Sequence, residues 1–238
     1  MAERSFDVVL FGATGFTGGL TAEYLARHVP AGTRWALAGR DRVKLAGVRD
    51  RLAAHDASLA ALPLLEADVD RPESVEAIAA AARVVISTVG PYVRYGEPLV
   101  AACADSGTHY LDLTGEPEFV NTTYVRHHAR AVATGARLVH ACGFDSVPHD
   151  LGVYFTVQHL PADVPLRIRG YVRAHAAFSG GTLSSAVTAF SRGRANLASA
   201  RARKAAESHG GDRRARYVPG RPHREPVDSG WALPLLEA

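Results

Sequence analysis

Cysteine is scarce in this chain, and long apolar runs are missing. Its 238 residues include only two cysteines, Cys103 and Cys142. Two such thiols form neither a disulfide framework nor a zinc site, so we expect both to be small buried residues and no metal to be bound. No apolar segment is long enough to cross a bilayer, and the N-terminus leads directly into an apolar strand rather than a signal region. We therefore expect a cytoplasmic protein with no transmembrane segment.

Lysine is equally scarce, since Lys44 and Lys204 are the only two. Short-chain dehydrogenases of the common kind use a Tyr-x-x-x-Lys pair, in which the lysine lowers the tyrosine pKa so that the phenol can deliver a proton. No tyrosine here is followed by a lysine four residues later, which excludes that chemistry. The net charge of +3 is small and aromatic residues are not interleaved with the arginines, so no nucleic acid partner is expected.

The chain does contain a glycine-rich turn near its start. An apolar run, Phe6–Phe11, leads into G-x-x-G-x-x-G and then into an amphipathic segment that ends near Val29. Such glycines let a strand turn sharply into a helix, so that backbone N–H groups and the helix N-terminus can face a pyrophosphate. The glycine pattern alone is weak evidence for a dinucleotide site, and the strand and helix on either side of it support that assignment. The residues expected to bind a dinucleotide here are Gly12, Thr14, Gly15, Phe16, Thr17 and Gly18.

Arg40 indicates which dinucleotide is bound. It follows the second predicted strand, 35–38, at about the position where an NAD site places an acid against the ribose 2′-OH. A guanidinium instead offers a planar fork of donors to a 2′-phosphate, so Arg40, helped by Arg42 or Lys44, predicts NADP over NAD. The alternative is that Arg40 is a solvated charge at the start of the next helix and that Asp41 binds the ribose.

Strands and helices alternate along residues 1–142. We expect six strands, at 6–11, 35–38, 62–68, 83–88, 108–112 and 137–141, separated by five helices. This alternation predicts an α/β fold, a Rossmann doubly wound parallel sheet, because each crossover is right-handed.

Ligands in such a sheet lie at the carboxyl ends of the strands, which singles out the residues that follow each strand. We expect Asp68 beside the adenine. Four residues are expected beside the ribose and the nicotinamide: Ser87, Thr88, Gly90 and Pro91. The structural alternatives are that Asp68 is a polar strand terminator and that Gly90 and Pro91 form a tight turn.

Several segments together resemble the saccharopine dehydrogenase family. They are residues 12–18, 38–40, 87–92 with 95–98, 109–116 and 142–148. They are most similar to its branch of saccharopine dehydrogenase-like oxidoreductases, which includes trans-acting enoyl reductases. The resemblance implies a Rossmann domain at 1–142 and, at 143–238, a second α/β domain that carries substrate contacts and often dimerises. It also implies NADP-dependent reduction of a C=C or C=N bond in a lipid, polyketide or amino-acid-like substrate, such as an acyl thioester.

Members of this branch are longer than this chain, which stops in an apolar stretch at 231–238. The second domain is therefore expected to be incomplete. Within it we expect a helix to about residue 159, a strand at 165–173, a long helix from Gly180 to about Ala206, and a mobile loop near 209–230.

Tyr92 is the first candidate for a donor to the substrate. Hydride addition to an enoyl thioester leaves an enolate oxygen that needs donors, and a phenol can donate at neutral pH. Tyr95, Asp112, Glu116 and Asp145 are weaker candidates. Each has a structural alternative, as a packing aromatic or as a helix cap. A non-catalytic NADP-binding regulator and an inactive fragment are the alternative functions.

Overall fold

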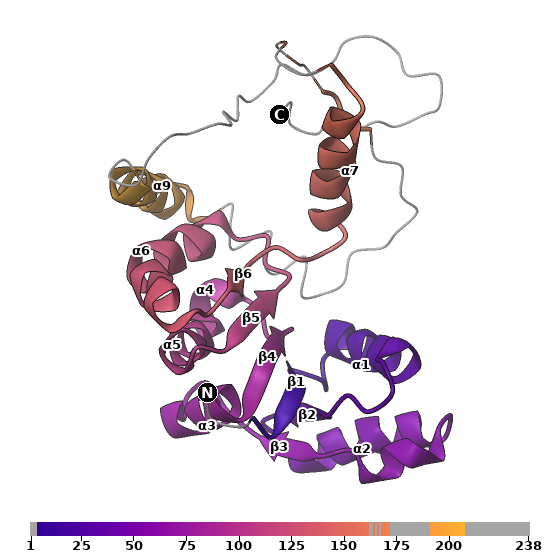
Figure 1. Ribbon diagram of the computed structural model, residues 1–238. Coiled ribbons are helices and arrows are strands. Elements are labelled where there is room, and N and C mark those ends of the chain that lie inside the picture. Colours follow the sequence, from indigo (N-terminus) through magenta and orange to yellow (C-terminus); the bar gives the residue numbers. More distant parts are fainter. Residues whose placement is uncertain (1–3, 162–163, 165, 167, 172–190, 208–238) are drawn as a thin grey trace.

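A six-stranded parallel sheet forms the centre of the structure (Figure 1). The computed structural model describes residues 4–161, 164, 166, 168–171 and 191–207. The strands are β1 (Phe6–Phe11), β2 (Trp35–Gly39), β3 (Leu64–Glu66), β4 (Ala82–Ser87), β5 (His109–Asp112) and β6 (Leu138–Val139). Their spatial order is β3-β2-β1-β4-β5-β6 and every pairing is parallel. This order confirms the predicted α/β doubly wound sheet.

Helices pack on both faces of the sheet: α1 (Phe16–His28), α2 (Arg42–Ala53), α3 (Pro72–Ala81), α5 (Glu97–Ser106) and α6 (Pro117–Thr134). The other described helices are the single turn α4 (Tyr92–Tyr95), α7 (Val147–Gln158) and α9 (Gly193–Glu207), with a 3₁₀ turn at Ala57–Ala61. Alternate residues of β1 point to opposite faces, as the pleat requires. Val9 and Phe11 pack in a core with residues of α3 and α5, whereas Leu10 packs in a second core with residues of α1 and α2.

The edge strands β3 and β6 are shorter than the predicted strands at 62–68 and 137–141. Each pairs with one neighbour only, β3 with β2 and β6 with β5. An edge strand pairs on one side only, so fewer of its residues are held in the sheet by hydrogen bonds. The hydrophobic pattern does not show which strands lie at an edge, and it therefore predicts a strand over the whole apolar run. The four inner strands match their predicted positions within one residue.

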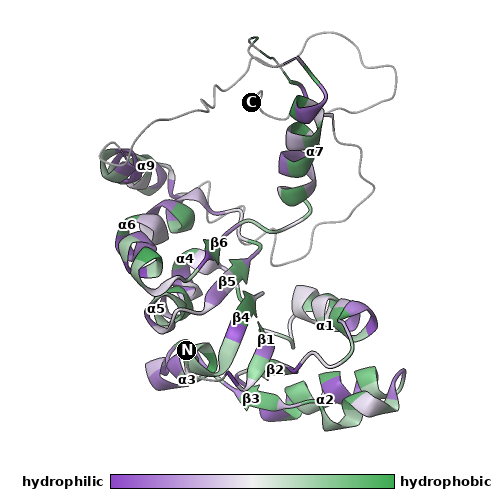
Figure 2. Ribbon diagram, viewed as in Figure 1, coloured by the Kyte–Doolittle hydropathy of each residue, from purple (hydrophilic) through white to green (hydrophobic). Residues whose placement is uncertain are grey.

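Beyond β6, the predicted helix to about residue 159 is present as α7. Figure 2 shows hydrophobic residues on α7, yet none of its side chains is buried against the described residues. Of the predicted strand at 165–173, residues 166 and 168–171 are described and are not in a strand; the others lie outside the described residues. So do residues 180–190 and the predicted loop at 209–230. The described end of the predicted long helix is α9, which packs on α6.

Two hydrogen bonds of 2.7 Å from Arg192 to Glu118 hold α9 to the start of α6. The guanidinium of Arg203 also lies 4.7 Å from the ring centroid of Tyr124 on α6. Among the residues that the structure describes, no helix has the length and apolar character needed to cross a bilayer.

Candidate cofactor-binding site

The glycine turn between β1 and α1 allows two close backbone approaches. Gly12 has φ +90°, a conformation that favours glycine, and a Cβ there would lie 2.7 Å from Thr88 Oγ1. A Cβ on Gly18 would lie 2.1 Å from the carbonyl oxygen of Gly12. Helix α1 therefore packs directly on the turn, which only a glycine at position 18 permits. These are the contacts that a phosphate-binding strand–turn–helix requires.

The N-terminus of α1 is open to an anion. Its N-cap is Gly15, which has no side chain to bond the first amides, and its first turn carries no acidic residue. The first N–H groups of any helix lack intrahelical partners and carry partial positive charge. Thr14, Gly15 and Phe16 are exposed at this end. Backbone donors and the helix dipole thus favour a phosphate here.

A pocket of about 270 Å³ lies at the carboxyl ends of the strands. Its lining consists of Phe11, Gly12, Thr14, Gly15, Gly39, Arg40, Val69, Asp70, Thr88, Val89, Gly90 and Tyr95. The structure thereby brings together six of the predicted cofactor-binding residues: Gly12, Thr14, Gly15, Arg40, Thr88 and Gly90. Tyr95, a weaker candidate for a donor to the substrate, also lies on this wall.

The other predicted cofactor-binding residues do not line this pocket. Phe16 and Thr17 belong to the first turn of α1, and Gly18 lies beneath it against Gly12. Asp68 accepts a hydrogen bond from the amide of Asp70 at 3.1 Å, as the strand-terminator alternative predicts. Ser87 is 1% exposed, and Pro91 follows Gly90 through a cis peptide.

Arg40 differs from the basic residues that follow it. Arg42 donates to the carbonyl of Leu64 at 3.2 Å, and the Lys44 ammonium lies 3.7 Å from Asp41. Arg40 is exposed and makes no hydrogen bond or ion pair to the residues that the structure describes. Its guanidinium is therefore available to a ligand.

Asp41, the alternative ribose ligand, is already used as the N-cap of α2. Its side chain accepts hydrogen bonds of 3.0 Å from the amides of Val43 and Lys44. The bond from the Lys44 amide is the main reason why the pKa of Asp41 is lowered. Both bonds go to Oδ1, and Oδ2 lies 3.7 Å from the Lys44 ammonium, so the carboxylate already has partners within the protein, which disfavours a second role in ribose binding.

Tyr92 occupies a position that suits packing rather than contact with a substrate. It is 5% exposed, its hydroxyl donates to the carbonyl of Ser87 at 3.0 Å, and its ring lies 5.7 Å from that of Phe119. Burial, together with the nearby charge of Asp112, raises the pKa of the Tyr92 phenol. Tyr92 therefore fits the structural alternative. Tyr95, only three residues later, is 38% exposed.

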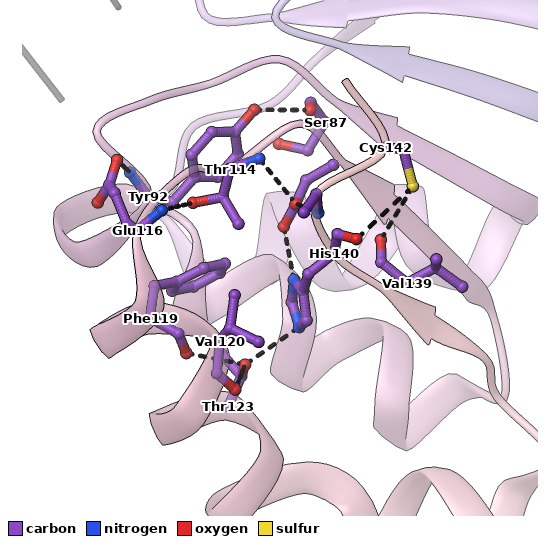
Figure 3. Close-up of polar contacts among 12 residues, drawn as sticks. Ser87, Tyr92, Thr114, Glu116, Phe119, Val120, Thr123, Val139, His140 and Cys142 are labelled. Carbon is purple, nitrogen blue, oxygen red and sulfur yellow. Dashed lines mark hydrogen bonds and ion pairs between the residues drawn. The ribbon is translucent and has the colours of Figure 1, made fainter. Parts of the chain in front are cut away.

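A buried polar network lies where β4, β5 and β6 end (Figure 3). Asp112 Oδ1 accepts from the amides of Thr114 at 3.0 Å and Ala141 at 3.1 Å, while Oδ2 lies 2.7 Å from His140 Nδ1. The other ring nitrogen of His140 lies 3.1 Å from Thr123 Oγ1. Because a carboxylate can only accept, His140 donates from Nδ1.

Sequence reasoning missed His140 and Thr123 in this network. The available signal was a histidine near the end of a predicted apolar strand, beside the predicted neighbour that ends in Asp112. Ends of adjacent parallel strands meet, so the pair could have been expected from the strand order.

Two of the weaker acidic candidates, for which a helix cap is the structural alternative, do not cap a helix with their side chains. Glu116 is the N-cap of α6, but its side chain makes no capping bond to that helix; it accepts instead from the amides of Tyr92 and Val93. Asp145 is exposed, and the N-cap of α7 is Ser146. Between these segments, Ala141 has φ 57°, a left-handed conformation in a residue other than glycine.

Comparisons with known proteins agree with this architecture. The family model for the saccharopine dehydrogenase NADP-binding domain matches residues 8–139. A trans-acting enoyl reductase of Mycobacterium tuberculosis is 56% identical over 153 residues, which are 64% of this chain and 36% of that protein. Another protein of the same organism is 50% identical over 190 residues, covering 76% of this chain and 43% of its own length. The chain thus spans less than half the length of these relatives.

Among solved structures, apo saccharopine dehydrogenase (L-Glu forming) from Saccharomyces cerevisiae is similar in fold. The TM-score is 0.53 at 16% identity, covering 65% of this chain and 31% of that one. The family model spans more than half of the sequence, and this chain therefore belongs to the saccharopine dehydrogenase NADP-binding domain family.

Proposed function

We propose that this chain binds NADPH in the pocket beside the glycine turn and serves as the cofactor-binding part of an oxidoreductase. NADP is the cofactor that the family match indicates. The observation that carries the proposal is the convergence of three features at one pocket: the close-packed turn at Gly12, the start of α1 without a side-chain cap, and the guanidinium of Arg40, which has no partner among the described residues.

Each feature suits one part of the dinucleotide. The amides at the start of α1 would hold the pyrophosphate, because they are unpaired donors at a positive helix end. Arg40 would hold the 2′-phosphate through its planar fork of donors. Thr88 and Gly90 would contact the ribose and nicotinamide portion, since they follow β4 on the same pocket wall. The bound nicotinamide supplies hydride.

The reaction is proposed to be reduction of a C=C bond in an acyl thioester, or of a C=N bond. Support comes from 56% identity to a protein named as a trans-acting enoyl reductase. Tyr95 is the better placed phenol to donate toward a substrate, because it is partly exposed on the pocket wall while Tyr92 is enclosed.

We also propose a cytoplasmic location, a substrate domain beginning near residue 143, and a homodimer formed by that domain. The exposed apolar side chains of α7 support such an interface.

The cofactor assignment is tested by comparing Arg40→Ala with Lys44→Ala. Calorimetric titration of Arg40→Ala should show NADPH binding at least about 30-fold weaker, with NADH binding changed less than about threefold, because only NADPH carries the 2′-phosphate. Lys44→Ala serves as the matched control, since Lys44 is paired with Asp41, and should bind both cofactors almost as the unmodified chain does. Equal weakening of NADPH and NADH would show that Arg40 does not contact the 2′-phosphate.

The reaction is tested by NADPH oxidation with enoyl-thioester and imine acceptors. The expected result is NADPH-dependent turnover of one of these acceptor classes. Tight NADPH binding without turnover of any acceptor would instead support the alternative function, a non-catalytic NADP-binding regulator.

A further inference from the structure

One wall of the cofactor pocket is a short turn held in place by a different part of the fold. Gly90 and Tyr95 line the pocket, and the single-turn helix α4, Tyr92–Tyr95, ends in the second of them. Pro91 precedes α4 and provides no side chain that bonds its first amides. Something else must satisfy these donors, because unpaired amides inside a protein are costly.

Glu116 satisfies two of these amides. It lies at the start of α6, far along the sequence, and is 3% exposed. Its Oε1 accepts from the Tyr92 amide at 3.0 Å and its Oε2 accepts from the Val93 amide at 2.8 Å. A carboxylate suits this position for two reasons. It has one acceptor oxygen for each amide, and its negative charge faces the N–H groups at the start of α4.

Packing from the first turn of α6 reinforces these bonds. Figure 3 shows the rings of Tyr92 and Phe119 beside Glu116. Gly96, just after α4, lies so close to Phe119 that a Cβ would be 2.6 Å from its ring and 2.9 Å from the Tyr92 carbonyl oxygen. The segment between Gly90 and Gly96 is therefore seated on α6 through both polar and apolar contacts.

We propose that Glu116 is a positioning residue for the cofactor pocket. Its carboxylate fixes the α4 turn and thereby sets where Gly90 and Tyr95 meet the bound dinucleotide, although Glu116 does not line the pocket itself. This inference rests on the proposed function, because it assigns Glu116 a role in NADPH binding.

The test is Glu116→Gln in the full chain, with Thr108→Val as a matched control. Glutamine keeps the size but has one acceptor oxygen, so one of the two amides would face an NH₂ group. Thr108 is fully buried just before β5, at the opposite end of the sheet, where its hydroxyl donates to the carbonyl of Ala79 at 2.6 Å. Its replacement removes a buried hydrogen bond without affecting the pocket.

Glu116→Gln should weaken NADPH binding about tenfold and speed hydrogen exchange at the amides of Tyr92 and Val93, measured by mass spectrometry at a temperature where the chain stays folded. Thr108→Val should lower the melting temperature while NADPH affinity stays unchanged. Gly96→Ala provides a second route should Glu116→Gln fail to fold. It leaves the carboxylate intact but displaces the turn from Phe119, and should weaken NADPH by a similar factor.

Unchanged NADPH affinity despite faster exchange at Tyr92 and Val93 would overturn the positioning role. So would an equal loss of affinity in Thr108→Val, because the effect would then follow stability alone. If the unmodified chain fails to bind NADPH, the proposed function falls; exchange at Tyr92 and Val93 still reports separately whether Glu116 holds the turn.

Discussion

The two halves of the sheet treat polar groups in opposite ways. Around β1 and β2, the features that would meet a ligand are backbone amides, glycines and the exposed Arg40. Around β4 and β5, the carboxylates of Asp112 and Glu116 are at most 3% exposed and accept hydrogen bonds from backbone amides of the protein itself. One half keeps its donors available for a ligand, while the other uses its acceptors to hold loops in place. We therefore expect the first half to supply direct ligand contacts and the second to hold the surrounding loops in place.

The largest expected effect is at the open half, from Gly18→Ala. A Cβ 2.1 Å from the Gly12 carbonyl oxygen cannot be accommodated unless α1 moves away from the turn. We expect a loss of about 3 kcal/mol in the free energy of unfolding and at least about tenfold weaker NADPH binding. Urea unfolding and calorimetry would measure both.

Gly19→Ala is the matched control, because a Cβ on the adjacent glycine meets nothing within 4 Å. It should leave stability unchanged or raise it by up to about 1 kcal/mol, since alanine favours a helix. A similar loss in both variants would mean that close packing on Gly12 is not the cause.

An intermediate effect is expected in the closed half, from Asp112→Asn. The amide group can keep one oxygen for Thr114 and Ala141, but it places a donor against His140 Nδ1. Loss of a buried charged acceptor should cost about 2 kcal/mol in urea unfolding. Asp105→Asn, which alters an exposed ion pair with Arg130, should change stability little. Equal effects in the two variants would show that the buried bonds of Asp112 contribute no more than an exposed ion pair.

The smallest expected effect distinguishes two phenols at the boundary between the halves. Tyr92→Phe removes the bond to the Ser87 carbonyl and should cost about 1 kcal/mol of stability, while NADPH oxidation is retained. Tyr95→Phe should leave stability unchanged and lower the turnover rate, because Tyr95 lines the pocket and is partly exposed. Abolished turnover in Tyr92→Phe, with stability intact, would restore Tyr92 as the donor to the substrate.

The same contrast explains what could be predicted from the sequence. Local pattern predicts three features of the first half: the strand at 6–11, the turn with Gly12 and Gly18, and the position of Arg40 after β2. Apolar runs, glycine spacing and strand ends can be recognised from neighbouring residues alone. The contacts of Glu116 with Tyr92 and of Asp112 with His140 join residues more than 20 positions apart. Pattern could place Tyr92 after β4, but not show that α6 encloses it while Tyr95 stays exposed.

Ala141 has a further consequence for the way in which the chain leaves the sheet. Its left-handed backbone costs of order 1 kcal/mol, and Asp112 holds it there by accepting the Ala141 amide while its own carbonyl oxygen accepts from Cys142. Those two bonds couple the exit of β6 to the end of β5. The direction in which the chain leaves the sheet is therefore set at Ala141, before α7 begins. The left-handed conformation that sets this direction lowers the local stability of the backbone.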